Sequence, residues 1–235
     1  MKILTWNLAC LPKNINFFRN PHNVIDKIID TLLEKNADVI FLQEVFDKDI
    51  ETKIKNRFMK YNYNFDSVTD YKQMSSNGLV TLTKYQIADT DLYEFENYTS
   101  VEYFIKKGIL VTKTKNPDLF LFNTHIQSDG LNIMYYRCKT MRTLQYKEFS
   151  EYVNELPETS KVVLGGDYNE DLNEENFKDF VKDVKFKLTV NKDKMITFPY
   201  EKRQLDYIMA NFGKQSFDVH QTELSDHYLF ESNLK

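Results

Sequence analysis

Apolar and polar positions at the start of the chain alternate between strand and helix patterns. Residues 2–8 predict a strand, and apolar residues recur at helical spacing over 24–33. A compact apolar run over 39–42 then predicts a buried strand. A right-handed crossover makes the two strands parallel neighbours, so we expect Asn7 and Glu44, at the strand ends, on one edge of a sheet.

The middle of the chain predicts one helix followed mainly by strands. A lysine-asparagine-proline-aspartate turn joins the last two strands as an antiparallel hairpin. The predicted elements are a helix over 47–59, strands over 61–65 and 78–83 joined by an Asn77-Gly78 hairpin turn, a strand or extended loop over 93–101, and strands over 108–115 and 119–125.

The remaining pattern returns to alternating helices and strands, which is typical of an α/β fold. We find no linker, low-complexity block or short repeat, and we predict a single domain over 1–235. The expected elements are a helix over 137–154, a strand over 161–165, a helix over 174–184 capped by Asn173, and strands over 204–210 and 224–230.

The run from Leu164 to Asn169 combines a buried strand with two glycines and two polar residues. The glycines free the backbone from side-chain clashes, so we expect a tight turn at the strand end. That turn presents Asp167 and Asn169, a carboxylate acceptor and an amide donor. The same residues also suit an ordinary Asx turn, so this motif needs partners from other segments.

Composition narrows the class of protein without identifying it. A hydrophobic content of 42% in 235 residues indicates a real core, and two cysteines provide neither a disulfide framework nor zinc spacing. The N-terminus lacks the apolar core of a signal peptide, so we expect a cytoplasmic protein. A net charge of −4 does not indicate nucleic-acid binding, and basic clusters such as Lys106 and Lys107 are typical of solvated faces.

Polar residues recur at the ends of apolar runs. Each one alone suits a cap or an exposed loop, but Asp206 lies within an apolar run, where a carboxylate is costly to bury unless it meets a histidine or a cation. Their joint recurrence favours a functional site. The set is Asn7, Glu44, His125, Asp167 with Asn169, Asp206, and Asp226 with His227.

Six motifs in a fixed order resemble those of the endonuclease/exonuclease/phosphatase superfamily, typified by deoxyribonuclease I. The resemblance covers nearly the whole chain and implies a four-layer αββα sandwich, in which two packed mixed β-sheets are flanked by helices. The motifs are Thr5-Trp6-Asn7, Leu42-Gln43-Glu44, Asn123-Thr124-His125, Gly166-Asp167-Tyr168-Asn169, Leu205-Asp206-Tyr207 and Ser225-Asp226-His227.

Within the superfamily the chain is most similar to bacterial neutral sphingomyelinases. One difference is that only about a dozen residues separate Met209 from Leu224, where the secreted enzymes carry a longer insertion with an exposed aromatic hairpin. The matching segments are 42–47, 77–80, 124–129, Arg142 with Gln145, and 225–228.

The resemblance implies phosphodiester hydrolysis with Mg²⁺, or Mn²⁺, Co²⁺ or Ca²⁺ in its place. Glu44 is the expected metal ligand, with Asn7 in support and Asp226 reaching the ion through another ligand or a water. Such chemistry needs charge neutralisation, a positioned water and a protonated leaving group.

The other matched residues have expected roles in the same reaction. Asp167 orients the attacking water, and Asn169 donates to the phosphoryl oxygen as charge develops. His227 is the candidate general base or phosphate contact, with Asp206 as its orienter. His125 either acts as general acid or holds the phosphate.

Three functions remain open from the sequence. The first is a sphingomyelinase C-like phosphodiesterase acting on a phospholipid head group or small phosphodiester. The second is a nuclease or DNA-repair phosphodiesterase, whose basic clusters would follow a nucleic-acid backbone. The third, an inactive binding module, is the weakest because every position needed for turnover holds a suitable residue type. We expect a monomer without a transmembrane segment.

Overall fold

A computed structural model describes residues 1–11, 20–70, 75–99, 105–129 and 135–235 of the chain. No helix in this described part is long and apolar enough to cross a membrane. The helices are the short 3₁₀ helix η1 (Pro21–Asn23), α1 (Ile25–Lys35), α2 (Lys48–Met59), α3 (Tyr135–Asn154) and α4 (Glu175–Asp183).

The strands form two large sheets and one small hairpin. The six-stranded sheet has the order β12 (Gln215–His220), β13 (Leu229–Leu234), β1 (Lys2–Cys10), β2 (Val39–Val45), β6 (Val80–Thr83) and β3 (Asn64–Asp66). The five-stranded sheet has the order β11 (Asp206–Ala210), β10 (Val162–Asp167), β9 (Leu119–His125), β8 (Gly108–Thr114) and β7 (Ile87–Glu94). The hairpin pairs β4 (Thr69–Asp70) with β5 (Ser75–Ser76).

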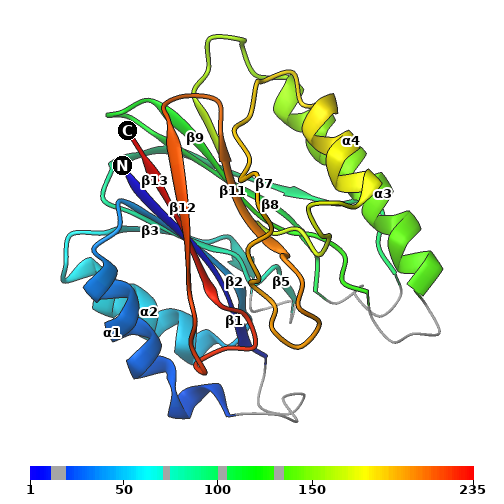
Figure 1. Cartoon of the computed structure of the whole chain (residues 1–235). Helices are drawn as coiled ribbons and strands as arrows, with labels where there is room; N and C mark the ends of the chain where they lie inside the picture. The colour runs from blue at the N-terminus through cyan, green and yellow to red at the C-terminus, as the bar shows by residue number, and fades with distance from the viewer. Residues whose placement is uncertain (12–19, 71–74, 100–104, 130–134) are drawn as a thin grey trace.

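Three apolar clusters organise these elements into four layers. One cluster lies between the six-stranded sheet and helices α1 and α2, and a second lies between the five-stranded sheet and helices α3 and α4. The third cluster lies between the sheets and includes Phe41, Leu121 and Val163. Figure 1 shows the helices on the two outer faces of the paired sheets. The expected four-layer αββα sandwich is therefore confirmed.

Each sheet contains one parallel pair, and these pairs determine where the site forms. Strands β1 and β2 run parallel, with Asn7 opposite Gln43. Strands β9 and β10 also run parallel, with Asp167 opposite His125. Strands of a parallel pair end at the same edge of a sheet, so the polar residues at these ends collect at one edge of each sheet.

The structure corrects several predicted elements. Strand β7 precedes most of the predicted 93–101 segment, of which residues 100 and 101 lie outside the described part, and β12 was not predicted. Residues 224–228 are irregular, because the last strand begins at Leu229. Helix α4 has Glu174 rather than Asn173 at its N-cap. Strands β3 and β6 are paired, but β4 and β5 lie between them in the chain, so Asn77-Gly78 is not a hairpin turn that joins them directly.

The two glycines before Asp167 do not form a turn. Gly165 and Gly166 lie inside β10 and pair with strands on both sides. A β-carbon at Gly165 would clash with the ring of Phe41 from the other sheet, and one at Gly166 would clash with the backbone of Thr124. Gly166 also has a φ of 142°, which favours glycine. The missing side chains of these glycines therefore let Phe41 and the backbone of β9 lie close to β10.

Replacing Gly165 with alanine tests the importance of this close approach. We expect Gly165→Ala to lower the free energy of unfolding by about 1–3 kcal/mol, because the added methyl overpacks the core against Phe41. Urea denaturation measures the loss. The double variant Gly165→Ala/Phe41→Leu should lose less than the sum of the two single variants, because the smaller side chain gives way. Additive losses would exclude Phe41 as the cause.

Candidate active site

Four strand ends meet where the two sheets face each other. Asn7 and Glu44 come from the parallel strands β1 and β2, and His125 and Asp167 come from β9 and β10. Asn7, His125 and Asp167 are buried, and Glu44 is partly exposed. All four are site residues predicted from the sequence, and the structure brings them into contact with one another.

A single amide joins the two sheets at this point. The Asn7 Nδ2 donates to Glu44 Oε1 at 2.9 Å and to Asp167 Oδ2 at 3.0 Å. Its own Oδ1 accepts from the backbone N–H of Ala9 at 3.0 Å, which fixes the side chain. Two carboxylates from different sheets are thus held close together.

Both carboxylates are difficult to ionise in this setting. Loss of solvent raises the pKa of Glu44 to about 7, with a further upward contribution from the charge of Asp226. Burial likewise raises the pKa of Asp167 to about 6, although the neighbouring His227 opposes that rise. Perturbed carboxyl groups that converge in one place are typical of functional sites.

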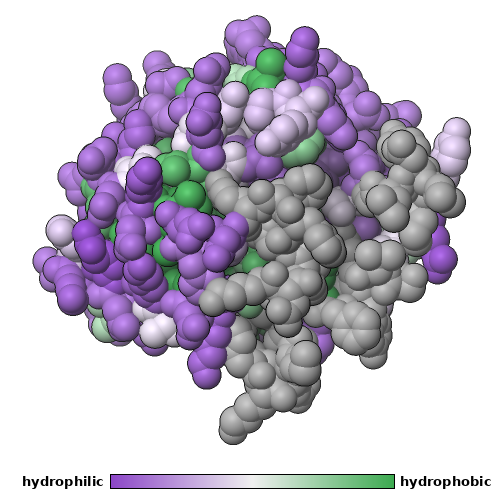
Figure 2. Space-filling model, turned by 90° about the horizontal axis from the view of Figure 1, so that it is seen from below, coloured by the Kyte–Doolittle hydropathy of each residue, from purple (hydrophilic) through white to green (hydrophobic). Residues whose placement is uncertain are grey.

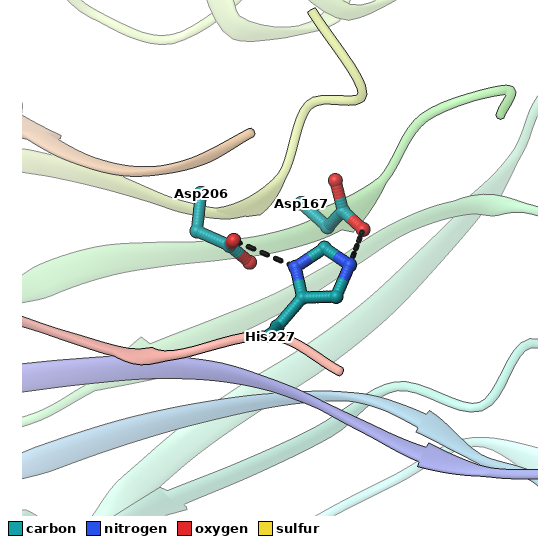
Figure 3. A group of neighbouring side chains, drawn as sticks. All are labelled: Asp167, Asp206 and His227. Atoms are coloured by element: carbon teal, nitrogen blue, oxygen red, sulfur yellow. Dashed lines mark hydrogen bonds and ion pairs between the residues drawn. The ribbon is translucent and has the colours of Figure 1, made fainter. Parts of the chain in front are cut away.

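His227 lies between two carboxylates (Figure 3). Its Nδ1 is 2.8 Å from Asp206 Oδ2, and its Nε2 is 3.7 Å from Asp167 Oδ2. Burial alone would lower the pKa of His227, but the charges of Asp206 and Asp167 outweigh it and raise the pKa to about 10. The ring is therefore an imidazolium at neutral pH. The expectation that Asp206 meets a histidine is confirmed.

These three side chains also have the spacing of a metal-ligand group. Ligand atoms of Asp167, Asp206 and His227 lie within 4.8 Å of one another. However, the hydrogen bond to Asp206 occupies Nδ1 of His227, and its short length indicates an ion pair rather than two ligands separated by an ion. We therefore assign these three residues to a charge network and not to the metal site.

The second predicted histidine, His125, is uncharged. Burial, reinforced by the charge of Lys107, lowers the pKa of His125 well below its ordinary value, so the ring is neutral. Its Nε2 lies 3.1 Å from the Lys107 Nζ, 3.6 Å from Asp167 Oδ2 and 3.8 Å from Glu44 Oε1. A neutral ring in this position accepts a hydrogen bond from the lysine at Nε2.

Lys107 is a site residue that was not predicted from the sequence. It was grouped with Lys106 as part of a solvated cluster, but it is buried and donates to the Ile126 carbonyl at 2.7 Å. Its charge also lowers the pKa of both Glu44 and Asp167. The available signal was its place directly before the apolar strand that begins at Gly108, where a side chain is drawn into the core.

Asn169 and Asp226 lie at the margin of the cluster. The backbone N–H of Asn169 donates to Asp167 Oδ1 at 2.9 Å, and its Nδ2 donates to the Ile126 carbonyl at 2.9 Å. Asp226 accepts from the Ser225 hydroxyl at 3.2 Å and influences Glu44 through its charge. The structure thus brings every predicted site residue to one region, two of them at its edge.

Arginines tie the loops of the site to helix α3. The carboxylate of Asp129 forms ion pairs with Arg142 Nη2 and Arg203 Nη1, each at 2.5 Å. Arg142 also pairs with Glu170, and Arg203 Nη2 donates to the Asn169 carbonyl at 3.4 Å. The segments that follow His125 and Asp167 are therefore cross-linked to the turn that carries Arg203, a residue not predicted from the sequence.

Aromatic rings extend from the site toward solvent. The Phe198 ring lies 5.0 Å from the His227 ring and 5.7 Å from the Tyr200 ring, measured between centroids. Tyr200 is 79% exposed.

Seen from below, the described surface is mainly hydrophilic, with apolar residues in small areas between polar ones (Figure 2).

Comparison with known proteins identifies the family of this chain. The family described as the Endonuclease/Exonuclease/phosphatase family matches residues 4–227. The chain belongs to this family. Sphingomyelinase C of Bacillus cereus is 26% identical over 199 residues, which are 76% of this chain and 60% of that protein. The match thus spans less than two thirds of that relative's length.

Solved structures that are similar over nearly the whole chain share its fold. Beta toxin from Staphylococcus aureus in its F277A, P278A form with bound magnesium ions has a TM-score of 0.85 and 21% identity, over 100% of this chain and 99% of that one. D. rerio TDP2 complexed with single strand DNA product has a TM-score of 0.75 and 15% identity, over 99% and 97% of the two chains.

The residues of this family member suit a hard divalent cation. Glu44 offers carboxylate oxygens, which Mg²⁺ prefers as ligands, and the Asn7 Nδ2 fixes that carboxylate in place. Loss of solvent is the largest cause of the raised pKa values of Glu44 and Asp167, so the ionised form of each carboxylate is poorly solvated. A cation beside Glu44 would stabilise its ionised carboxylate. The residues present therefore fit the metal ion that the family resemblance implies.

The Asp129 ion pairs predict a specific dependence of stability on pH. Arg142 and Arg203 outweigh the effect of burial and lower the pKa of Asp129 below its ordinary value of 3.8. A depressed pKa in the folded state stabilises the protein above the unfolded value, and this contribution disappears as pH falls through the folded value. The stability difference between wild type and Asp129→Asn should therefore shrink below pH 3.8. Urea denaturation at several pH values measures it, and a constant difference would contradict the assignment.

Proposed function

We propose that the protein is a Mg²⁺-dependent phosphodiesterase of sphingomyelinase C-like type, which hydrolyses a phospholipid head group ester or a small phosphodiester with an activated water. The observation that carries this proposal is the pairing of two desolvated carboxylates, Glu44 and Asp167, with the His227 imidazolium. A cation site and an anion contact side by side suit a phosphodiester, whose hydrolysis needs both.

Glu44 would hold the metal ion, with Asn7 supporting its carboxylate through Nδ2 and Asp226 at the margin of that site. A bound Mg²⁺ would supply charge neutralisation and lower the pKa of water. The related beta toxin structure with bound magnesium supports this choice of ion. Mn²⁺, Co²⁺ and Ca²⁺ are candidates to replace it, and ion replacement distinguishes them.

Other side chains position the reacting groups in this proposal. Asp167 orients the attacking water, because its carboxylate is fixed by Asn7 and faces His227. The His227 imidazolium, held by Asp206, donates to a phosphoryl oxygen as negative charge develops. Its charge state favours the role of phosphate contact over that of general base. The Lys107 ammonium, held in place by the neutral His125 ring, contacts the phosphate, and Asn169 adds a donor.

A nuclease or DNA-repair phosphodiesterase is the alternative. The fold shared with D. rerio TDP2 complexed with single strand DNA product supports it. The exposed Tyr200 ring next to Phe198 would suit base stacking in that case. The net charge of −4 counts against a polyanionic substrate, and we therefore rank this function second. That the protein acts as a monomer remains a prediction.

Magnesium should stabilise the folded protein through Glu44. A magnesium concentration of about 100 times Kd should raise the free energy of unfolding by about 2.7 kcal/mol, because the ion binds only the folded state. The variant Glu44→Gln should lose this effect. In metal-free protein it should be at least as stable as wild type, because a desolvated carboxylate is removed. Thermal unfolding with and without Mg²⁺ measures both effects.

The matched control for this experiment is Glu94→Gln, an exposed carboxylate on β7 that pairs with Lys106. It should respond to Mg²⁺ as wild type does. A stabilisation by Mg²⁺ that survives in Glu44→Gln would place the ion elsewhere.

The substrate class can be determined with a panel of phosphodiesters. Purified protein with Mg²⁺ should hydrolyse sphingomyelin micelles or bis-p-nitrophenyl phosphate, and not plasmid DNA. Asp167→Ala and His227→Ala should each abolish turnover, and circular dichroism checks that each variant is folded, because His227→Ala leaves the buried Asp206 carboxylate unpaired. Hydrolysis of plasmid alone would favour the nuclease. Wild-type rates in either variant would contradict the assigned roles.

A further inference from the structure

Thr197 lies in the segment between α4 and β11 and is completely buried. Its hydroxyl oxygen accepts two backbone hydrogen bonds, from Leu205 N at 3.0 Å and from Asp206 N at 3.1 Å. The second of these amides belongs to the residue whose carboxylate meets His227. The hydroxyl thus contacts the backbone at the point where Asp206 enters its strand.

The backbone of Thr197 also contacts the segment that carries His227. Its carbonyl accepts from Tyr228 N at 2.7 Å, and Tyr228 directly follows His227. Its N–H donates to the Arg203 carbonyl at 3.0 Å, which closes the turn against itself. One buried residue therefore contacts the chain at Asp206 and next to His227.

This double contact matters because the pair spans the two sheets. Asp206 begins β11 in the five-stranded sheet, and His227 precedes β13 in the six-stranded sheet. Strand pairing within each sheet does not determine the distance between these two side chains. On the other side, Trp6 Nε1 donates to the His227 carbonyl at 2.9 Å and anchors that residue to β1.

The orientation of the Asp206 carboxylate depends on its backbone. Its Oδ2 faces His227, whereas within the described residues its buried Oδ1 has no hydrogen-bond partner. With only one oxygen in a hydrogen bond, the carboxylate stays at bonding distance from His227 only while both backbones keep their positions. Hydrogen bonds weaken steeply with distance and angle, so a small shift of either backbone would loosen the pair.

We infer that Thr197 is a positioning residue for the proposed reaction, which holds the Asp206 carboxylate and the His227 imidazole at hydrogen-bonding distance across the two sheets. This inference rests on the proposed function for its kinetic consequence. A misplacement of a reacting group by about 1 Å costs up to about 100-fold in rate. Loss of the Thr197 hydroxyl should therefore affect turnover more than substrate binding.

The experiment compares Thr197→Val, which keeps the shape and removes the hydroxyl, with Thr197→Ser, which keeps the hydroxyl. On bis-p-nitrophenyl phosphate with Mg²⁺ we expect kcat to fall about 10- to 100-fold in Thr197→Val, with KM within about threefold of wild type. Thr197→Ser should keep kcat within about threefold. If Thr197→Val does not fold, Thr197→Ala replaces it, because the smaller side chain leaves room for water.

A second background separates positioning from a general effect on folding. In Asp206→Asn, which weakens the pair itself, adding Thr197→Val should change kcat by no more than about twofold, because coupled residues are not additive. The matched control is Thr114→Val, which removes a buried hydroxyl bonded to the Pro117 carbonyl at the far end of β8. It should lower the melting temperature and leave kcat unchanged. Equal losses from Thr197→Val in both backgrounds would overturn the inference.

A spectroscopic measurement tests the geometry without any substrate. The His227 Nδ1 proton, hydrogen-bonded to Asp206, should give a low-field ¹H NMR resonance in wild type and Thr197→Ser, and this resonance should be lost in Thr197→Val. If wild type hydrolyses no phosphodiester but the resonance follows this pattern, the proposed function fails and the positioning role stands. If the enzyme is active and the resonance persists in Thr197→Val, the positioning role is wrong.

Discussion

The crowding of carboxylates around one amide is the constraint on which the site depends. Glu44 and Asp167 approach Asn7 from different sheets, and loss of solvent raises the pKa of both. Isolated carboxylates in such a place would cost folding free energy. The charges of His227 and Lys107 lower the pKa of Asp167 and so offset part of this cost. The carboxylates that are costly to bury are thus the same groups that the proposed phosphodiester chemistry uses.

This arrangement requires two sheets in accurate register, and a buried polar contact supports that register. Beneath the site, Gln43 of one sheet donates to Asn123 of the other at 2.8 Å, and Asn123 donates to the Leu42 and Val80 carbonyls. Satisfied polar contacts in a dry interior specify one arrangement more strongly than apolar packing does. Close packing at Gly165 adds a steric limit. The site is therefore positioned by the interface between the sheets as well as by the strands themselves.

The two histidines show how environment separates identical side chains into different roles. His227 is hydrogen-bonded to the Asp206 carboxylate and is charged, whereas burial and the charge of Lys107 lower the pKa of His125 and keep it neutral. From sequence both were candidates for acid, base or phosphate contact, because charge state depends on neighbours that come from other strands. Pairs of groups whose pKa values are pushed apart in this way are typical of active sites. Only the positions of Lys107 and Asp206 in three dimensions distinguish the two rings.

By itself the sequence determined which residues end the buried strands, because apolar runs and their polar ends are local, and an ordered set of motifs predicted the four layers. It did not reveal β7 or β12, since these edge strands expose much of their length and lack an apolar run. Nor did it single out Lys107, Thr197 or Arg203. Their importance comes from contacts with segments distant in the chain, and such contacts exist only once the two sheets have packed together.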